Sequence, residues 1–181
     1  GVAVSAGTEL LERLRAARLH QQRSASDVDA LVKANIGLHS TDYGSPYLSA
    51  WARLADLDAP RLFGRLSSGD GLVRVNAMRN TVHVVHVDDL ATIFAATGAA
   101  VGLTGRRSPG LKELSDAEIA AGVDAVCSAL ADGPLGNNEL KAALPSQAAH
   151  LRYWLLAAMG TGAVIRADAT HARSNRTRYA L

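Results

Sequence analysis

A change in hydrophobic period, which occurs twice along the chain, is the strongest constraint on the fold. Over residues 26–66 apolar side chains recur at helical spacing, and over residues 72–85 they alternate as in the two strands of a hairpin. The same order, three helical stretches and then two strand-like runs, returns over residues 115–181. Three helices followed by a hairpin is the order of a winged helix. We therefore predict a mainly α protein with small β-hairpins (α+β), built from tandem winged helix-turn-helix modules.

Start and stop signals give the expected helix boundaries in the first half. An amphipathic helix is expected over residues 8–20. Ser26 is expected to cap the next helix, which ends near Gly37. Pro46 and Pro60 each open a further helix, because proline suits the first helical turn. With the hairpin that follows, these helices complete the first module.

The second half carries an equally clear helix start. Ser115 and Glu118 form a capping-box pattern, which predicts a long helix from this point. Asn137 or Asn138 is expected to cap a short helix, and a third helix is expected over residues 147–159. Two short strands then close the second module.

A glycine-rich stretch separates the two halves. Asp88 is expected to start a helix that reaches about Thr97, after which glycine, serine and proline become frequent. We therefore predict an N-terminal winged-helix module over residues 1–97, a linker over residues 98–114 and a C-terminal winged-helix module over residues 115–181.

Composition indicates the cellular compartment in which the protein is expected. The longest mostly apolar stretch, residues 91–103, is shorter than the roughly 20 residues of a membrane span, so no membrane partner is expected. Cys127, the single cysteine, cannot form an internal disulfide and lies on an apolar helix face. The first residues lack a signal-peptide pattern. We expect a cytoplasmic protein, associated with the nucleoid if the source is bacterial.

Positive charge is concentrated near the C-terminus. The net charge is only +2, yet residues 146–181 hold five arginines and one acid, Asp168. In a helix-turn-helix the third helix enters the major groove, and the wing contacts phosphates. We therefore expect residues of the third helix and the wing to bind double-stranded DNA. They are Gln147, His150, Arg152, Arg173, Arg176 and Arg178. Two alternatives stay open, a solvated surface and a protein-interaction module.

Four segments of the first half carry a resemblance to a known family. They are Arg18-Leu-His-Gln-Gln, Ile36-Gly-Leu-His-Ser-Thr-Asp-Tyr, Ala50-Trp-Ala-Arg, and residues 72–85. This pattern, over about residues 10–87, resembles the AlkZ/YcaQ-type family of winged-helix DNA-binding proteins, which includes DNA glycosylases for alkylated or crosslinked bases. Members are usually much longer than this chain.

The resemblance implies a catalytic site at His39, Thr41 and Asp42. Here the family's glycosylases carry glutamine, an apolar or small residue, and then glutamine or aspartate, whereas this chain has His39-Ser40-Thr41. His39 could accept a proton or hold water, and Thr41 or Asp42 could align that water. Asp42 could also offset charge on the sugar. The structural alternative is that Thr41 or Asp42 caps the turn before Pro46 and that His39 is a hydrogen-bonded structural histidine.

The resemblance also implies that the first hairpin lines a DNA channel. Arg79 is expected at the turn, with Thr81 and His83 on one strand face and Arg74 on the same face of the other strand. Alternatively, Arg79 and Thr81 tie the hairpin to a helix end. No metal site is expected, because His83 and His86 would face opposite sides of the strand.

Three functions follow from these patterns. The first is a DNA-binding winged-helix protein that acts as a monofunctional DNA glycosylase and needs no cofactor. The second is a catalytically inactive DNA-binding regulator, which retained the scaffold without the glutamines. The third is a protein-interaction module. Residues 39–42 discriminate between the first two.

Overall fold

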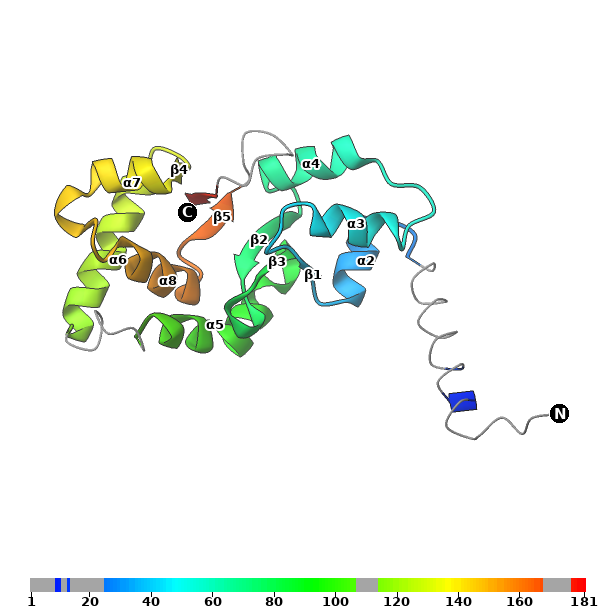
Figure 1. Cartoon of the computed structure of the whole chain (residues 1–181), viewed down its shortest axis with the longest axis horizontal. Helices are drawn as coiled ribbons and strands as arrows, with labels where there is room; N and C mark the ends of the chain where they lie inside the picture. The colour runs from blue at the N-terminus through cyan, green and yellow to red at the C-terminus, as the bar shows by residue number, and fades with distance from the viewer. Residues whose placement is uncertain (1–8, 11–12, 14–24, 107–113, 168–176) are drawn as a thin grey trace.

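The computed structural model describes residues 9–10, 13, 25–106, 114–167 and 177–181 (Figure 1). Within them one order of elements occurs twice: helix, short strand, two helices, hairpin. The first set is α2 (Val28–Ala34), β1 (Leu38–His39), α3 (Ser45–Trp51), α4 (Ala59–Ser68), β2 (Leu72–Asn76) and β3 (Val82–His86). The second is α6 (Asp116–Leu130), β4 (Leu135–Gly136), α7 (Asn137–Ala143), α8 (Leu151–Thr161), β5 (Ile165–Ala167) and β6 (Arg178–Ala180). Helix α5 (Leu90–Arg106) lies between the sets, and 3-10 turns occur at η1 (Met78–Asn80), η2 (Val87–Asp89) and η4 (Pro145–Gln147). The predicted mixture of helices and small hairpins is confirmed.

Helix caps follow the predicted chemistry, with shifts of one residue. The Ser115–Glu118 capping box is present, since the Ser115 hydroxyl accepts from the Glu118 N–H and the Glu118 carboxylate accepts from the Ser115 N–H. Helix α2 is capped by Asp27 rather than Ser26, whose hydroxyl instead donates to the Asp27 carboxylate. The expected helix over residues 8–20 falls largely outside the described residues.

The cap of α7 also differs from the prediction. Gly136, not Asn137 or Asn138, is its N-cap residue, and the Glu139 carboxylate accepts from the Gly136 N–H at 2.6 Å. A residue that belongs to strand β4 therefore also begins the helix. The third helix of this half, α8, begins at Leu151, because the expected earlier turns form the separate 3-10 turn η4.

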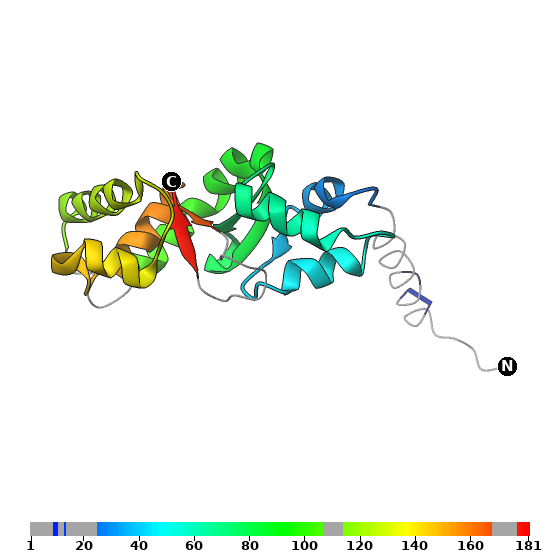
Figure 2. The same ribbon diagram turned by 90° about the horizontal axis from the view of Figure 1, so that it is seen from above.

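The two hairpins join in one antiparallel sheet. The strand order is β1-β3-β2-β5-β6-β4, and the two halves meet where Arg74 of β2 pairs with Arg166 of β5. Strand β1 adds to the first hairpin through His39 opposite His83, and β4 adds to the second in the same way. The molecule is elongated, with α2–α4 and α6–α8 towards opposite ends of this sheet (Figures 1 and 2).

Residues 98–106 are helical, which corrects the expected linker. Helix α5 continues through the glycines to Arg106 and packs mainly on α8. A Cβ atom at Gly98 would lie 2.3 Å from the Gly160 carbonyl oxygen, so the two helix backbones are in direct contact. Gly98 permits this close approach and does not end the helix. Residues 107–113 of the expected linker lie outside the described residues.

Helix α5 is more apolar than sequence inspection suggested. The window Val87–Thr104, with a mean hydropathy of 1.2, is long and apolar enough to cross a membrane by length and composition alone. In the fold, Ile93 and Val101 of this helix are buried, while most of its outer residues are alanine and threonine. Only 17% of the window Val87–Thr104 is buried within the fold.

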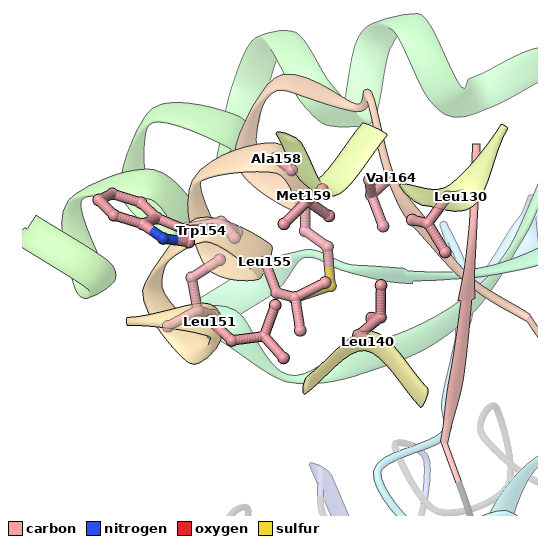
Figure 3. Packing of buried hydrophobic residues seen from close by; sticks show 11 residues of the cluster. Leu130, Leu140, Leu151, Trp154, Leu155, Ala158, Met159 and Val164 are labelled. Carbon is pink, nitrogen blue, oxygen red and sulfur yellow. The ribbon is translucent and has the colours of Figure 1, made fainter. Parts of the chain in front are cut away.

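Buried side chains form three clusters. One lies between β2–β3 and helices α2–α4, and a second lies between the other face of these strands and α5. The third fills the second half (Figure 3), where Trp154, Leu155 and Met159 of α8 meet Leu140 of α7 and Leu130 of α6. Packing on both faces of β2–β3 fixes which side each strand residue occupies.

Candidate functional site

Strand register separates two residues that were expected on one face. Arg74 lies opposite Val84, whereas His83 lies opposite Val75 and His39. Because directly paired residues point to the same side of a sheet, Arg74 and His83 point to opposite sides. The expectation that Arg74 shares a face with Thr81 and His83 is therefore wrong. Arg74 is only 2% exposed.

Residues 39–41 alternate between these two faces. The His39 ring meets the His83 ring edge-on, with 5.5 Å between centroids, and the Thr41 hydroxyl lies 3.2 Å from His39 Nε2. Ser40 points to the other face, where its buried hydroxyl accepts a 2.9 Å hydrogen bond from Arg74 Nε. His39 and Thr41 are exposed, so solvent reaches this pair.

His83 is buried and packs edge-on against the exposed His39 ring. Burial lowers the pKa of His83, and the nearby charges of His39 and Arg79 act in the same direction, against the hydrogen bond to Thr81. The 3.1 Å contact between His83 Nδ1 and the Thr81 carbonyl oxygen places the proton of the neutral ring on Nδ1, since a carbonyl only accepts.

Asp42 has a structural role in the turn before α3. Its Oδ1 accepts a 2.7 Å hydrogen bond from the Gly44 N–H, which orders the turn before Pro46. Beside it, the Tyr43 ring lies under the Arg74 guanidinium, 4.6 Å from ring centroid to Cζ. The turn-capping alternative considered for Asp42 is thus present, and Asp42 also lines a cavity.

This cavity, which we call the loop cavity, has a volume of about 320 Å³. Residues after β1 form one side, and residues of strands β2, β3 and β5 together with Thr177 form the other. It is lined by Ser40, Thr41, Asp42, Tyr43, Arg74, Val82, Arg166 and Thr177. Of the predicted catalytic residues, Thr41 and Asp42 line the loop cavity, and Thr41 also contacts His39 on the opposite face.

A second, larger hollow of about 1240 Å³, the central groove, lies over the second half of the sheet and helices α7 and α8. Its described lining residues include four basic side chains and one acidic side chain, Glu139, which is bonded to the Gly136 N–H. The basic residues are Lys141, Arg152, Arg166 and Arg178. Asparagine and threonine side chains add polar groups of the kind that contact phosphates, and alanine, leucine and methionine side chains of α8 and the turn before it line much of the rest.

Arg166 connects the two hollows, because it and Thr177 line both. Its Nε donates to Asn76 Oδ1 at 2.7 Å, and its Nη1 donates to the Thr177 hydroxyl at 3.3 Å. The guanidinium also lies over the Tyr179 ring. Sequence reasoning did not select Arg166, although it ends the apolar run 163–165. Only the β2–β5 pairing shows which side it faces.

The predicted DNA-binding residues of the second half divide into three groups. Arg152 and Arg178 line the central groove. Gln147 and His150 do not; the His150 ring instead lies 5.8 Å from the Trp154 ring. Arg173 and Arg176 lie outside the described residues.

Helix α8 does not present the broad free face expected of a recognition helix. It packs against α5 and α6, and its buried residues include Leu151, Leu155, Leu156 and Met159. The expectation overlooked α5, which was thought to end near Thr97 and instead covers one side of α8. Arg152 remains exposed towards the groove.

The turn of the first hairpin supports the structural interpretation of Thr81. The Thr81 hydroxyl donates to the Met78 carbonyl oxygen at 2.8 Å and closes the turn. Arg79 and Asn80 both have left-handed backbone angles, φ 54° and 58°, and Arg79 is exposed at the tip. Within the described part of the chain, no three His, Cys, Asp or Glu side chains gather as metal ligands would.

Fold and site together define a mainly helical α+β protein with a basic groove beside a histidine- and hydroxyl-bearing loop. Residues 32–181 match the family described as DNA glycosylase AlkZ-like, and the chain belongs to this family. The comparison with curated proteins finds no match.

One solved structure shows the same fold. The Streptomyces sahachiroi DNA glycosylase AlkZ superposes with a TM-score of 0.70 at 16% sequence identity. The match covers 91% of this chain and 47% of that one, so the chain spans about half the length of the solved protein.

Proposed function

We propose that the protein binds double-stranded DNA in the central groove and acts as a monofunctional glycosylase on an alkylated or crosslinked base. The observation that carries this proposal is the position of Ser40, Thr41 and Asp42, in the wall of a cavity that shares Arg166 and Thr177 with the basic groove. His39 contacts Thr41 from the other face of the strand. Membership of a DNA glycosylase-like family supports it.

In the proposed reaction, water attacks C1′ of the damaged nucleotide. The bond from the water oxygen to C1′ forms while the N-glycosidic bond breaks, and its electron pair passes to the leaving base. A purine that is cationic through alkylation thereby leaves as a neutral base. His39 accepts the proton of the water, with Thr41 3.2 Å from its Nε2 to orient the ring and the water. Asp42 stabilises positive charge on the sugar electrostatically.

Release of damaged bases tests the proposal. Duplexes that carry 7-methylguanine or 3-methyladenine are incubated with the protein, and abasic sites are detected by alkaline strand cleavage. We expect product from the parent chain and a loss of about 10²–10⁴-fold in rate for His39→Ala. Ser67→Ala, an exposed change on α4, is the matched control and should retain the full rate.

A catalytically silent DNA-binding protein is the second candidate. It is favoured by the hydrogen bond between His39 and Thr41, which occupies groups that a hydrolase would turn towards water. Duplex binding without abasic product from the parent chain would establish this candidate and refute the enzyme. Absence of duplex binding at low salt would instead favour a protein-interaction module.

A further inference from the structure

We infer that the loop cavity is a binding site for a backbone phosphate of the DNA strand, and not a pocket for the excised base. The inference rests on the proposed DNA binding and adds the contact that sets the register of the strand. It follows from the donors that line the cavity, from their charge, and from the connection to the central groove.

The cavity is lined mainly by hydrogen-bond donors. Arg74 and Arg166 contribute guanidinium groups, which donate and never accept. The Ser40 oxygen accepts from Arg74 Nε, and the Thr177 oxygen accepts from Arg166 Nη1. Because these bonds use oxygen lone pairs, the two hydroxyl hydrogens stay available as donors. A group with several acceptor oxygens complements this lining.

Charge distinguishes a phosphate from an alkylated base. The described residues of the cavity wall include two arginines and one acid, Asp42, whose Oδ1 already accepts from the Gly44 N–H. A purine alkylated at N7 or N3 is cationic and would be repelled, whereas a phosphodiester anion would be attracted. Burial lowers the pKa of Arg74, and the neighbouring Tyr47 and Tyr43 act against this shift.

Position gives this phosphate a role in register. Arg166 and Thr177 line both hollows. A DNA strand that follows the central groove would therefore contact hydrogen-bond donors all the way to the cavity. Ser40 lies in the cavity wall, while its neighbours His39 and Thr41 contact each other on the opposite side of the strand. A phosphate held at Ser40 and Arg166 therefore fixes the position of the strand relative to residues 40–42.

A methylphosphonate scan tests the inference through binding alone. Duplexes with one neutral methylphosphonate at successive positions are titrated by fluorescence anisotropy against the parent chain and Arg166→Gln. We expect one position near the lesion to weaken parent binding about tenfold and to have little effect on Arg166→Gln. Equal losses in both proteins at every position would overturn the inference, as would absence of duplex binding.

Two further binding experiments test whether the cavity holds the damaged base or a free anion instead of a backbone phosphate. In a duplex with a preformed abasic site the base is missing, and Arg166→Gln should still weaken binding; if the effect of Arg166 disappears there, the cavity holds the base and the inference is wrong. Inorganic phosphate, at ionic strength matched with chloride, should compete weakly, whereas tight binding would identify a site for the free anion and overturn the strand contact.

Thr177→Val removes one hydroxyl donor with little change in shape. We expect it to reduce the effect of the same methylphosphonate position in part, as Arg166→Gln does. Agreement between the two variants would show that the result with Arg166→Gln does not come from misfolding. Since no arm measures base release, an inactive enzyme would leave the phosphate site intact, and equal methylphosphonate losses in both proteins would leave the glycosylase proposal standing.

Discussion

Ser40 and Arg74 form a polar contact that is almost fully buried, with exposures of 1% and 2%. The Ser40 hydroxyl accepts from Arg74 Nε, so Ser40→Ala leaves a charged donor without this acceptor. Removal of one partner of a buried hydrogen bond costs about 1–3 kcal/mol. We expect Ser40→Ala to lower the free energy of unfolding in urea by an amount in this range. The exposed change Ser67→Ala should alter it by less than about 0.5 kcal/mol, and equal effects would contradict the assignment.

His83 should make stability depend on pH. Its pKa is lowered in the folded protein, mainly by burial, so below the unfolded-state value of about 6.5 the unfolded chain binds the proton more readily. Stability contributed by neutral His83 is therefore full above pH 6.5 and is lost as the pH falls through the folded-state pKa. We expect the melting temperature to fall between pH 7.5 and 5, and His83→Gln to flatten this dependence. An unchanged profile in the variant would refute the role.

Some positions of single residues could be predicted from the sequence, and others depend on how the strands pair. The segment His39-Ser40-Thr41 was selected by resemblance, and the structure places Thr41 and Asp42 beside a cavity. The side on which Arg74 lies depends on pairing with Val84, and a shift of one residue in register reverses it. No local pattern in Leu72-Val-Arg-Val specifies that register.

The crossing of α5 and α8 depends on glycine at the contact. At Gly98 an added Cβ would meet the Gly160 backbone at 2.3 Å, and backbone atoms cannot move aside as a flexible side chain can. Gly102, one turn further along α5, has open space around its Cβ position. We expect Gly98→Ala to lower the free energy of unfolding by about 1–3 kcal/mol through overpacking. Gly102→Ala should be neutral or stabilising by up to about 1 kcal/mol, because alanine favours helix.

Urea unfolding of both variants decides this point. The two changes add the same methyl group to the same helix, so helix propensity cancels in the comparison. Equal stabilities for the two variants would show that α5 does not contact α8 as closely as the structure indicates.

Elements with strong local signals were predictable, and those formed by distant pairing were not. The capping box at Ser115 and the hairpin at residues 72–85 were identified correctly. Strands β1 and β4, two residues each, exist only through pairing with β3 and β6. The glycines of α5 were interpreted as a linker because their role is a contact with Gly160, some 60 residues later in the chain.

The β2–β5 pairing and the α5–α8 contact hold the two halves together. Both bring the second half against the first hairpin, so Arg166 hydrogen-bonds Asn76 and faces the loop cavity as well as the central groove. A continuous donor-lined surface thus depends on the joined sheet. Residues of either half alone would supply only part of it.

This surface predicts how DNA binding should respond to salt. Each phosphate contact releases about one counterion, so loss of one contact lowers the slope of log affinity against log salt by about 1. Arg152 is exposed and lines the central groove, whereas Arg61 is also exposed, on α4, and is not among the residues lining the groove. Both changes to alanine remove one positive charge and leave the net charge of the two variants equal.

We therefore expect Arg152→Ala to weaken duplex binding and to lower the salt slope by about 1, and Arg61→Ala to leave the slope unchanged. Fluorescence anisotropy titrations at salt concentrations of about 50 to 200 mM measure both the affinity and its salt slope. The comparison separates a specific groove from a general attraction of positive charge to DNA. Equal changes in slope for the two variants would mean that DNA is held by net charge alone, and the central groove would lose its assignment as the binding surface.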